Sequence, residues 1–352
     1  MKGGPSLASV FNSLNMANEG SADFRLLWIA DENFAVSPVE LNAIKNATTL
    51  ITNRFDIAEV TRTHKIKTFF SDFDIAQTGE KFDTIIYRVS KERYVSHRCL
   101  NIAREQLRER GRLILYGKKQ EGIKTYFEKA VKILGFQGGL EKEGEWYLAD
   151  LIAGDAVDSM LDDGEYDRFR FIADCFGYQL YSKPGVYGWK TVDAGSTLLA
   201  NCLSGEFGNQ DLTRKNVLDL GCGSGYLTLL AASLGVGKIA ATDNNATAIK
   251  AIQHNCAVNN IVADIYADDC GRNIAEAFDY IWCNPPFHQG FEVSGRLTER
   301  FIQAAHRLLV NGGSGYFVVN AFIPLETLSK SIFKKHEVLQ NDKKFKVVRL
   351  IK

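Results

Sequence analysis

Short apolar runs alternate with longer amphipathic stretches through the first half of the chain. Three runs have the length and apolar content of buried strands, while another stretch repeats its apolar residues at helical spacing and ends in glycine. The strand runs are RLLWIAD (25–31), FDTIIYRV (82–89) and GRLILYG (111–117), and the helical stretch is YVSHRCLNIAREQLRERG (94–111). Such an alternation of strands and helices predicts a parallel α/β sheet.

The same alternation restarts near residue 183. Four runs in this half have strand character: NVLDLG (216–221), KIAATD (238–243), FDYIWC (278–283) and GSGYFVVNAF (313–322). Between the halves lie the charged EKEGEW (141–146) and the Gly- and Asp-rich GDAVDSMLDDGEYDRFR (154–170), which we interpret as a connection. The pattern therefore predicts two α/β domains, residues 1–170 and 180–352.

The two halves share a local pattern that suggests duplication. FDTIIY (82–87) in the first half echoes FDYIWC in the second, and each is followed by a helix, a glycine turn and another strand. Two unrelated parallel-sheet domains could share such apolar strands, so that alternative stays open. The first half has no glycine cluster after its first strand and no prolines after FDTIIY. If it is a copy, we expect it to have lost its chemistry.

A glycine-rich loop follows the first strand of the second half. In VLDLGCGSGYL, Gly221, Gly223 and Gly225 let the backbone turn sharply and approach a ligand without obstruction by a Cβ atom. A tyrosine stands where a dinucleotide-binding motif has its last glycine, which disfavours NAD. Asp219 at the end of the same strand can meet a cationic or hydroxylated ligand. Asp243, at the end of the next strand, can accept hydrogen bonds from both hydroxyls of a ribose.

A rigid polar turn, CNPPFHQG (283–290), ends the FDYIWC strand. An exocyclic amine on a nucleobase is a poor nucleophile because its lone pair is delocalised into the ring. The Asn284 side-chain carbonyl and the Pro285 main-chain carbonyl can accept hydrogen bonds from such an amine, and the prolines stiffen these acceptors. Phe287 offers a ring face on which a flipped-out base can stack. We interpret the turn as a catalytic clamp for a planar NH₂ group, with a purely structural Asn-Pro-Pro turn as the alternative.

The succession of strand, glycine loop, helix, strand and aspartate resembles that of the class I methyltransferases. This resemblance implies S-adenosylmethionine as the cofactor, with the glycine loop against its amino-acid part and Asp243 on its ribose. Asp219 and Asn284 are further candidates for cofactor contact. The family's acidic residue that contacts adenine corresponds to Asp269 in ADDC, with Asp268 as the neighbouring candidate and a solvated turn as the alternative.

Longer motifs are similar to those of the RsmC/RlmG-type ribosomal RNA guanine-N2 methyltransferases. These motifs are NPPFHQG, the upstream KPGVYGWKTVDAGSTLL (183–199), and the downstream VVNAFIPLE (318–326) and FKVVRL (345–350). The sequence departs from the family at Trp189 and Lys190, where another polar pair is more common. The resemblance implies two tandem Rossmann-like class I methyltransferase domains, the N-terminal one degenerate. It also implies methylation of the exocyclic N2 amine of a guanine in ribosomal RNA, with the small subunit favoured, and ribosomal RNA or a ribosomal subunit as the partner.

Other polar residues flank the motifs. His288 is a candidate general base, but a lone histidine beside a turn is more often a structural or substrate-contacting residue, and the amine can lose its proton after methyl transfer. Asp193 and Ser196 are candidates for closing over the cofactor or the base, with a helix N-cap as the alternative. Basic residues gather in KSIFKKHE (330–337) and NDKKFKVVRLIK (341–352), where we expect either phosphate contacts or an ordinary solvated face. Further basic candidates stand in the first half, at Arg104, Arg108, Arg110 and Arg112.

Composition adds limits to this picture. The 42 basic and 42 acidic residues give a formal charge of zero, which argues against tight nonspecific RNA binding but leaves room for a local basic patch. The seven cysteines are scattered without a C-x-x-C pair, which predicts a reducing compartment and no metal site. The sequence predicts no signal peptide and no membrane-spanning run. We therefore expect a soluble cytoplasmic protein that acts as a monomer.

Two other functions remain open from the sequence. Protein glutamine N5-methyltransferases share the Asn-Pro-Pro type of clamp, but they usually carry a small helical domain where this chain predicts an α/β domain. A non-catalytic RNA-binding relative of the methyltransferases is the second alternative. The asparagine, the prolines and the three glycines argue against it for the second half, and their absence favours it for the first.

Overall fold

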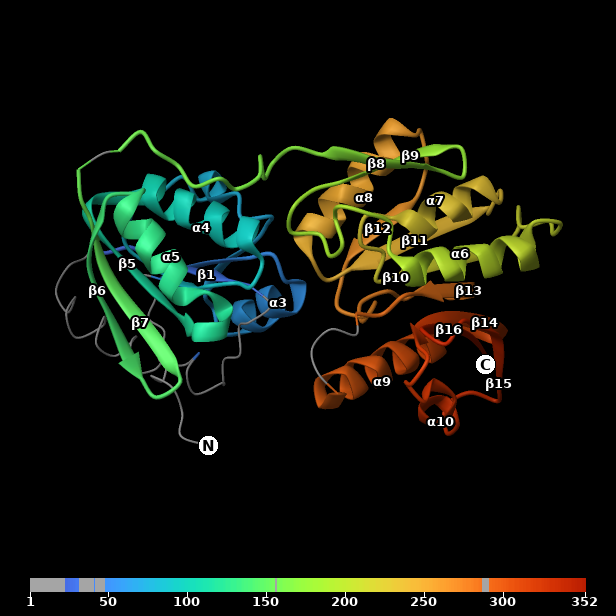
Figure 1. Cartoon of the computed structure of the whole chain (residues 1–352). Helices are drawn as coiled ribbons and strands as arrows, with labels where there is room; N and C mark the ends of the chain where they lie inside the picture. The colour runs from blue at the N-terminus through green and yellow to red at the C-terminus, as the bar shows by residue number, and fades with distance from the viewer. Residues whose placement is uncertain (1–22, 32–40, 42–47, 156, 287–290) are drawn as a thin grey trace. The chain divides into compact units, whose positions relative to one another are not determined.

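The computed structural model describes residues 23–31, 41, 48–155, 157–286 and 291–352, with only the backbone for 291–296. The chain divides into two compact units, residues 1–167 and 168–352 (Figure 1). Each unit is an α/β domain around a seven-stranded sheet. No helix in the described part of the chain has the length and apolar character that crossing a membrane requires.

The sheet of the first unit is mixed. Its strands are β1 (Leu26–Ala30), β2 (Thr48–Thr52), β3 (Lys67–Phe70), β4 (Phe82–Arg88), β5 (Leu107–Lys118), β6 (Phe136–Glu143) and β7 (Trp146–Ala153). They lie in the order β3-β2-β1-β4-β5-β7-β6. The strands from β3 to β5 pair in parallel, whereas β7 pairs antiparallel with both β5 and β6.

The sheet of the second unit repeats this arrangement. Its strands are β10 (Asn216–Leu220), β11 (Lys238–Asp243), β12 (Asp264–Ala267), β13 (Phe278–Cys283), β14 (Leu309–Asn320), β15 (Lys335–Asn341) and β16 (Phe345–Ile351). They lie in the order β12-β11-β10-β13-β14-β16-β15. The strands from β12 to β14 pair in parallel, whereas β16 pairs antiparallel with both β14 and β15. A separate hairpin, β8 (Arg170–Cys175) and β9 (Tyr178–Ser182), precedes this sheet.

The identical strand order supports duplication of one domain. FDTIIY lies in β4 and FDYIWC forms β13, and these two strands take the same position in their sheets. Such agreement over seven strands and two pairing directions exceeds what two unrelated parallel sheets would share by having apolar strands. The two tandem Rossmann-like α/β domains that the sequence predicts are confirmed.

Helices cover both faces of each sheet (Figure 1). The helices of the first unit are α3 (Phe55–Thr63), α4 (Arg93–Gln106) and α5 (Ile123–Lys132), with 3-10 turns at Ile75–Thr78 and Lys119–Glu121; those of the second are α6 (Ala194–Phe207), α7 (Tyr226–Ser233), α8 (Ala246–Val258), α9 (Phe291–Leu308) and α10 (Leu325–Ser329). Alternate residues of a strand point to opposite faces of the sheet and so contact different helices. In β10, for example, Leu218 and Leu220 pack in the cluster with α9 and α10, while Val217 packs in the cluster with α6 and α7.

The structure corrects several expectations. EKEGEW is no part of a connection, because it forms the turn of the β6–β7 hairpin. The predicted helix at 94–111 ends at Gln106, and the residues that follow extend β5 backwards to Leu107. Neither sheet is fully parallel, because the final hairpin of each unit returns antiparallel. Hairpins bring two strands together through a short turn, so charged turn residues can resemble a linker in sequence.

Candidate active site

Four parallel strands of the second sheet have their carboxyl ends on the same side of the sheet. Because β10 to β13 run parallel, their carboxyl ends meet there, where open α/β sheets bind their ligands. The glycine loop follows β10, Asp243 ends β11, Asp268 and Asp269 follow β12, and Asn284 follows β13. The topology therefore gathers most of the residues that the sequence selected.

The glycine loop depends on conformations that favour glycine. Gly221, Gly223 and Gly225 have φ of 81°, 54° and 90°, in the left-handed region. A Cβ at Gly225 would also lie 2.8 Å from Ile252 Cγ1 of α8. Both the positive φ and this close contact therefore disfavour a side chain at Gly225. No described atom lies within 4 Å of a Cβ built at Gly223, which leaves open space beside the loop.

Asp243 joins this loop to the start of α8. Its Oδ2 accepts a hydrogen bond from the Gly223 N–H at 2.9 Å, and its Oδ1 accepts from the Asn245 N–H at 2.9 Å. The carboxylate is half-buried. The predicted ribose contact is thus fixed in place beside the predicted glycine loop.

Asp219 lies in a different environment. Its side chain is buried and accepts a hydrogen bond from the Thr228 hydroxyl of α7 at 2.7 Å. Burial raises the pKa of this carboxyl to about 7, and the charge of Asp243 adds to the effect. The structure therefore places Asp219 beneath the loop against α7, and its contact with a cofactor stays a prediction.

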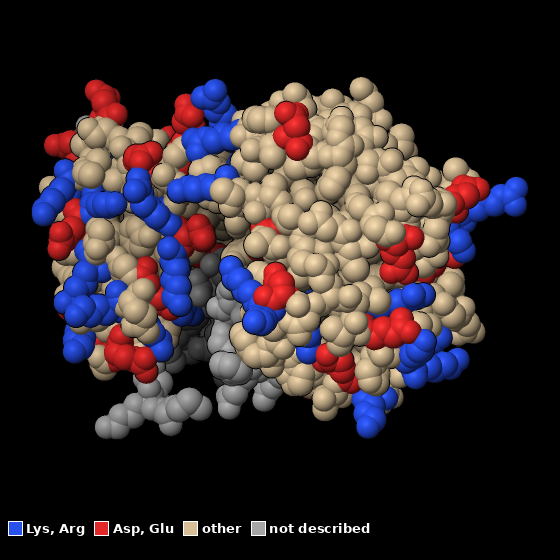
Figure 2. Space-filling model, turned by 45° about the vertical axis from the view of Figure 1, so that its right-hand side comes forward, with Lys and Arg blue, Asp and Glu red and all other residues tan. Residues whose placement is uncertain are grey.

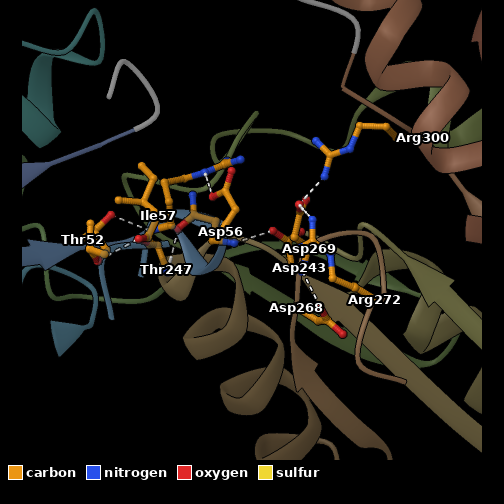
Figure 3. Close-up of polar contacts among 12 residues, drawn as sticks. Thr52, Asp56, Ile57, Asp243, Thr247, Asp268, Asp269, Arg272 and Arg300 are labelled. Carbon is orange, nitrogen blue, oxygen red and sulfur yellow. Dashed lines mark hydrogen bonds and ion pairs between the residues drawn. The ribbon is translucent and has the colours of Figure 1, made fainter. Parts of the chain in front are cut away.

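Asp268 and Asp269, in the turn after β12, have different binding partners. Asp268 accepts from the N–H groups of Asp269 and Asn273, both at 2.7 Å, and so holds the turn. Asp269 forms an ion pair with Arg300 of α9, and Arg272 lies 3.6 Å away (Figure 3). Both aspartates are buried, so the alternative of a solvated turn is wrong. The carboxylate of Asp268 is thus bound to the backbone of the turn, whereas that of Asp269 is bound to arginine side chains.

Asn284 is held by residues that precede it by about ninety positions. Its Nδ2 donates to Asp193 Oδ2 and to Ser196 Oγ, both at 2.8 Å. Asp193 is also the N-cap of α6, where the same Oδ2 accepts from the Ser196 N–H at 2.8 Å. A Cβ at Gly195 would lie 3.0 Å from Asp193 Oδ2, so a residue without a side chain gives this cluster room.

These contacts determine which side-chain atom of Asn284 is available to bind a substrate. Both amide hydrogens are in use, while no described residue donates to the Oδ1 atom. Asp193 and Ser196 therefore fix the carbonyl oxygen of Asn284 as an available acceptor. Pro285 follows as a buried residue. The helix-cap alternative for Asp193 is correct as far as it goes, but the cap also orients the predicted clamp. Sequence reasoning had no signal for this bond, because local spacing does not link the two segments.

Other predicted groups fall outside this geometry. Phe287 and His288 lie outside the described residues. Among the described residues, no cluster of three or more histidine, cysteine, aspartate or glutamate side chains could hold a metal ion.

The strand registers identify the corresponding positions of the first unit. The β1–β4 and β10–β13 pairings can be superimposed, as can the pairings of the neighbouring strands. The equivalents are Ala30 for Gly221, Thr52 for Asp243, Asp72 for Asp269 and Arg88 for Asn284. The amide, the ribose carboxylate and the first glycine are thus each replaced by a residue of different chemistry.

The remaining acidic equivalent is engaged within the first unit. Asp72 accepts a hydrogen bond at 2.8 Å from the hydroxyl of Tyr166, whose ring is buried in the core of that unit. Arg88, at the asparagine position, pairs with Glu121 at 2.7 Å. The corresponding edge of the first sheet therefore carries packing and ion pairs at these positions.

Comparisons with known proteins agree with this geometry. A family model described as the methyltransferase small domain matches residues 177–349. The ribosomal RNA small subunit methyltransferase C of Enterobacter sp. (strain 638) is 35% identical over 176 residues, which are 50% of this chain and 50% of that protein. The protein of that name from Erwinia tasmaniensis is 32% identical over 224 residues, 60% of this chain and 64% of that protein. The chain thus spans about half to just under two thirds of these relatives.

A solved structure extends the likeness to both units. It is that of the T. thermophilus 16S rRNA N2 methyltransferase RsmC in complex with AdoMet and guanosine, with a TM-score of 0.79 and 23% identity. The match covers 99% of this chain and 94% of the other, and at this identity it establishes the fold. Together these findings confirm the resemblance to the RsmC/RlmG-type proteins that the motifs gave.

Proposed function

We propose, from the premise that residues 177–349 belong to the methyltransferase small domain family, that this chain methylates ribosomal RNA. It transfers a methyl group from S-adenosylmethionine to the exocyclic N2 amine of a guanine, with small-subunit RNA favoured. The observation that carries the proposal is the Asn284 amide, whose hydrogens are bound by Asp193 and Ser196 and whose carbonyl oxygen stays available. The relatives named ribosomal RNA small subunit methyltransferase C support the choice of substrate.

The carboxyl edge of the second sheet fits the proposed cofactor. Open space beside Gly223 admits the amino-acid part, while the half-buried Asp243 carboxylate can accept from the two ribose hydroxyls. We assign the adenine contact to Asp269. When bound, S-adenosylmethionine supplies an electrophilic methyl group on a sulfonium. The protein's part is to hold the acceptor amine in line with that methyl.

Asn284 and Pro285 act on the guanine amine. Their carbonyl oxygens accept its two N–H bonds, which draws the nitrogen out of conjugation and directs its lone pair away from the clamp. This contact strengthens as the nitrogen becomes tetrahedral, so it favours the transition state over the bound substrate. Phe287 stacks on the base. The methylated nitrogen is cationic and acidic, so it can release its proton to water, or to His288 as the candidate acceptor.

Asp193 and Ser196 serve as positioning residues in this scheme. By accepting both hydrogens of Asn284 Nδ2, they prevent the amide from rotating its nitrogen toward the substrate. The Asp193 carboxylate also polarises the amide and makes the carbonyl oxygen a stronger acceptor. These residues therefore contribute through Asn284 rather than by touching the base.

Two other functions are weaker candidates. A protein glutamine N5-methyltransferase would use the same clamp, but the α/β first unit differs from the small helical domain that we expect there. A non-catalytic RNA-binding protein would not need an amide fixed by two hydrogen bonds. We further propose that the protein acts in the cytoplasm as a monomer.

Transfer of labelled methyl groups tests the proposal. Purified protein, labelled S-adenosylmethionine and either ribosomal RNA, small subunits or ribosomal protein should give label in the RNA of one of the first two samples. Label in protein would favour the glutamine alternative, and no transfer to any sample would favour the non-catalytic one. Asn284→Ala should lower kcat about 10²–10³-fold, the usual loss for a contact made in the transition state.

A further inference from the structure

We infer that the tip of the β15–β16 hairpin, residues 341–345, contacts RNA phosphates beside the guanine that is being methylated. This inference rests on the proposed function and adds a binding surface to it. The tip carries NDKKF, part of a basic stretch for which the sequence left phosphate contacts and an ordinary solvated face as alternatives.

The tip lies at the carboxyl ends of β13 and β14, on the same side of the sheet as Asn284. Because β16 runs antiparallel to β14, it begins where β14 ends, and the Ala321 N–H donates to the Lys344 carbonyl at 2.9 Å. A Cβ built at Gly195 would lie 3.5 Å from Phe345 Cε1 and 3.6 Å from Asn284 Nδ2. The base of the tip and the clamp therefore border the same small space.

Hydrogen bonds fix the shape of the tip. The Asp342 Oδ1 accepts from the N–H groups of Lys344 at 2.9 Å and Phe345 at 2.6 Å, and these bonds lower the pKa of the Asp342 carboxyl. Asn341 Oδ1 accepts from the Lys343 N–H at 2.9 Å, where φ is 73°. A preorganised turn presents its side chains at a smaller entropic cost than a flexible loop.

Two lysines of the tip remain available to an anion. Lys346 is buried and pairs with Glu326 at 2.6 Å, which uses its charge within the fold. Lys343 and Lys344 are exposed, and neither forms an ion pair with any described residue. Lys344 instead lies over the Phe345 ring, with its Nζ 5.3 Å from the ring centre. Two exposed ammonium groups thus belong to a tip whose base, at Phe345, borders the clamp.

Several other basic side chains are engaged elsewhere. Lys215 pairs with Asp279 and Arg349 with Glu206, while basic and acidic side chains are mixed on the face that Figure 2 shows. Three of the four arginines flagged in the first half bind within their own unit: Arg104 to backbone carbonyls, Arg108 to Asp83 and Arg112 to Asp150. Such pairing lowers their value for an RNA track. Lys343 and Lys344 form no ion pair with a described residue, although the N–H groups of Phe345 and Lys344, helped by the charge of Lys344, lower the pKa of the neighbouring Asp342 carboxyl.

Phosphates are the groups that these lysines would meet. A guanine held at Asn284 carries its own phosphate and those of its neighbours, and lysine binds phosphate as a point charge. Contacts of this kind set the position of the RNA and carry no base information. The tip should therefore contribute to RNA affinity and to its salt dependence, and should leave the chemical step alone.

Two charge-matched double variants of the whole protein test this role. Lys343→Gln with Lys344→Gln removes the tip charges and keeps the aliphatic stems. The control, Lys334→Gln with Lys335→Gln, removes the same charge from the opposite end of the hairpin, where the Lys334 N–H donates to the Ile351 carbonyl. Methylation and RNA binding are measured from 50 to 200 mM salt.

The tip variant should raise KM for RNA several-fold and lower the slope of log Kd against log salt by about 1.4, or about 0.7 for each lost phosphate contact with a single strand. Its kcat at saturating RNA and its affinity for S-adenosylmethionine should match those of the unaltered protein. Equal effects of the two double variants, or no effect of the tip variant while the unaltered protein methylates RNA, would overturn the inference. If the unaltered protein methylates no RNA, the proposed function fails instead.

Discussion

At the residue scale, the bond between Asn284 and Asp193 decides how the clamp is oriented. Replacing Asp193 by serine keeps a side-chain oxygen that can cap α6, but the shorter side chain no longer reaches Asn284 Nδ2. We expect Asp193→Ser to lower kcat on the order of 10- to 100-fold, because misplaced acceptors cost that much, while cofactor affinity is kept. Steady-state kinetics on RNA and calorimetry with S-adenosylmethionine measure the two effects.

A matched substitution separates positioning from folding. Asp211 also holds a turn, since its Oδ1 accepts from the Thr213 N–H at 2.9 Å, but it lies before the amino end of β10. Asp211→Ser should leave kcat unchanged. If Asp193→Ser kept full turnover, or if the two variants lost turnover equally, Asp193 would be a helix cap and nothing more.

Asp219 gives the second unit a pH-dependent stability. Its pKa is about 7 in the folded protein and ordinary in the unfolded chain, so the folded state binds more protons between these values. Stability from this group is fully present below the unfolded pKa near 4 and is lost as the pH rises through about 7. Asp219→Asn can still accept from Thr228 but does not titrate.

Thermal unfolding from pH 4 to pH 8 measures this term. The Tm of the unaltered protein minus that of Asp219→Asn should become steadily more negative as the pH rises. A difference that stays constant, or one that grows more positive, would show that Asp219 is ionised without penalty in the folded state.

The sequence revealed some of these residues and not others. The glycines and Asp243 follow strands within one local motif, so spacing alone identified them. Asn284 was identified from the chemistry of its two following prolines. Its bond to Asp193 was not predictable, because the segments are 91 positions apart and meet only through the sheet topology.

At the element scale, the packing of α8 against the glycine loop fixes that loop. Gly225 is the N-cap of α7, with φ of 90°, and a Cβ there would lie 2.8 Å from Ile252 Cγ1. Gly235, just after α7, has φ of 70°, and a Cβ there would meet no described atom within 4 Å. Alanine at either position carries the left-handed strain of about 1–2 kcal/mol, but only Gly225→Ala adds a clash.

Urea unfolding and cofactor titration distinguish these two alanine variants. Gly225→Ala should lower the free energy of unfolding by more than Gly235→Ala and should also weaken binding of S-adenosylmethionine. Equal losses of stability would mean that α8 yields freely at Ile252, and unchanged cofactor binding by Gly225→Ala would separate the loop from the cofactor.

Elements with regular apolar periodicity were predictable, and hairpins were not. The runs at β1, β4, β5, β10, β11, β13 and β14 are buried and read as strands from sequence alone. The strand β6 is mostly exposed along Phe136–Glu143, so its sequence resembles a charged linker. Its strand conformation comes from pairing with β7 rather than from its own pattern.

At the scale of the whole molecule, the two units share one strand order, and only the second carries the glycine loop, Asp243 and Asn284. We therefore expect one S-adenosylmethionine per chain. Asp243→Ala should weaken binding about 10-fold or more, because a charged acceptor is lost, whereas the equivalent change Thr52→Ala in the first unit should leave binding intact. Calorimetry gives both the stoichiometry and the affinities.

Two sites per chain, or loss of binding on Thr52→Ala comparable with that on Asp243→Ala, would contradict a degenerate first unit.

The boundary and the separate roles of the two domains stay predictions of the sequence, residues 1–170 for RNA positioning or structure and 180–352 for catalysis. The structure divides the chain at residue 167, within the Gly- and Asp-rich stretch.

The most direct test of the central claim is nucleoside mass spectrometry of ribosomal RNA. RNA is compared from cells that carry the intact gene, lack it, or carry the Asn284→Ala change. The proposed function predicts that one N2-methylguanosine of the small-subunit RNA disappears in the second and third strains and that all other methylated nucleosides stay constant. An unchanged N2-methylguanosine content in all three strains would contradict it.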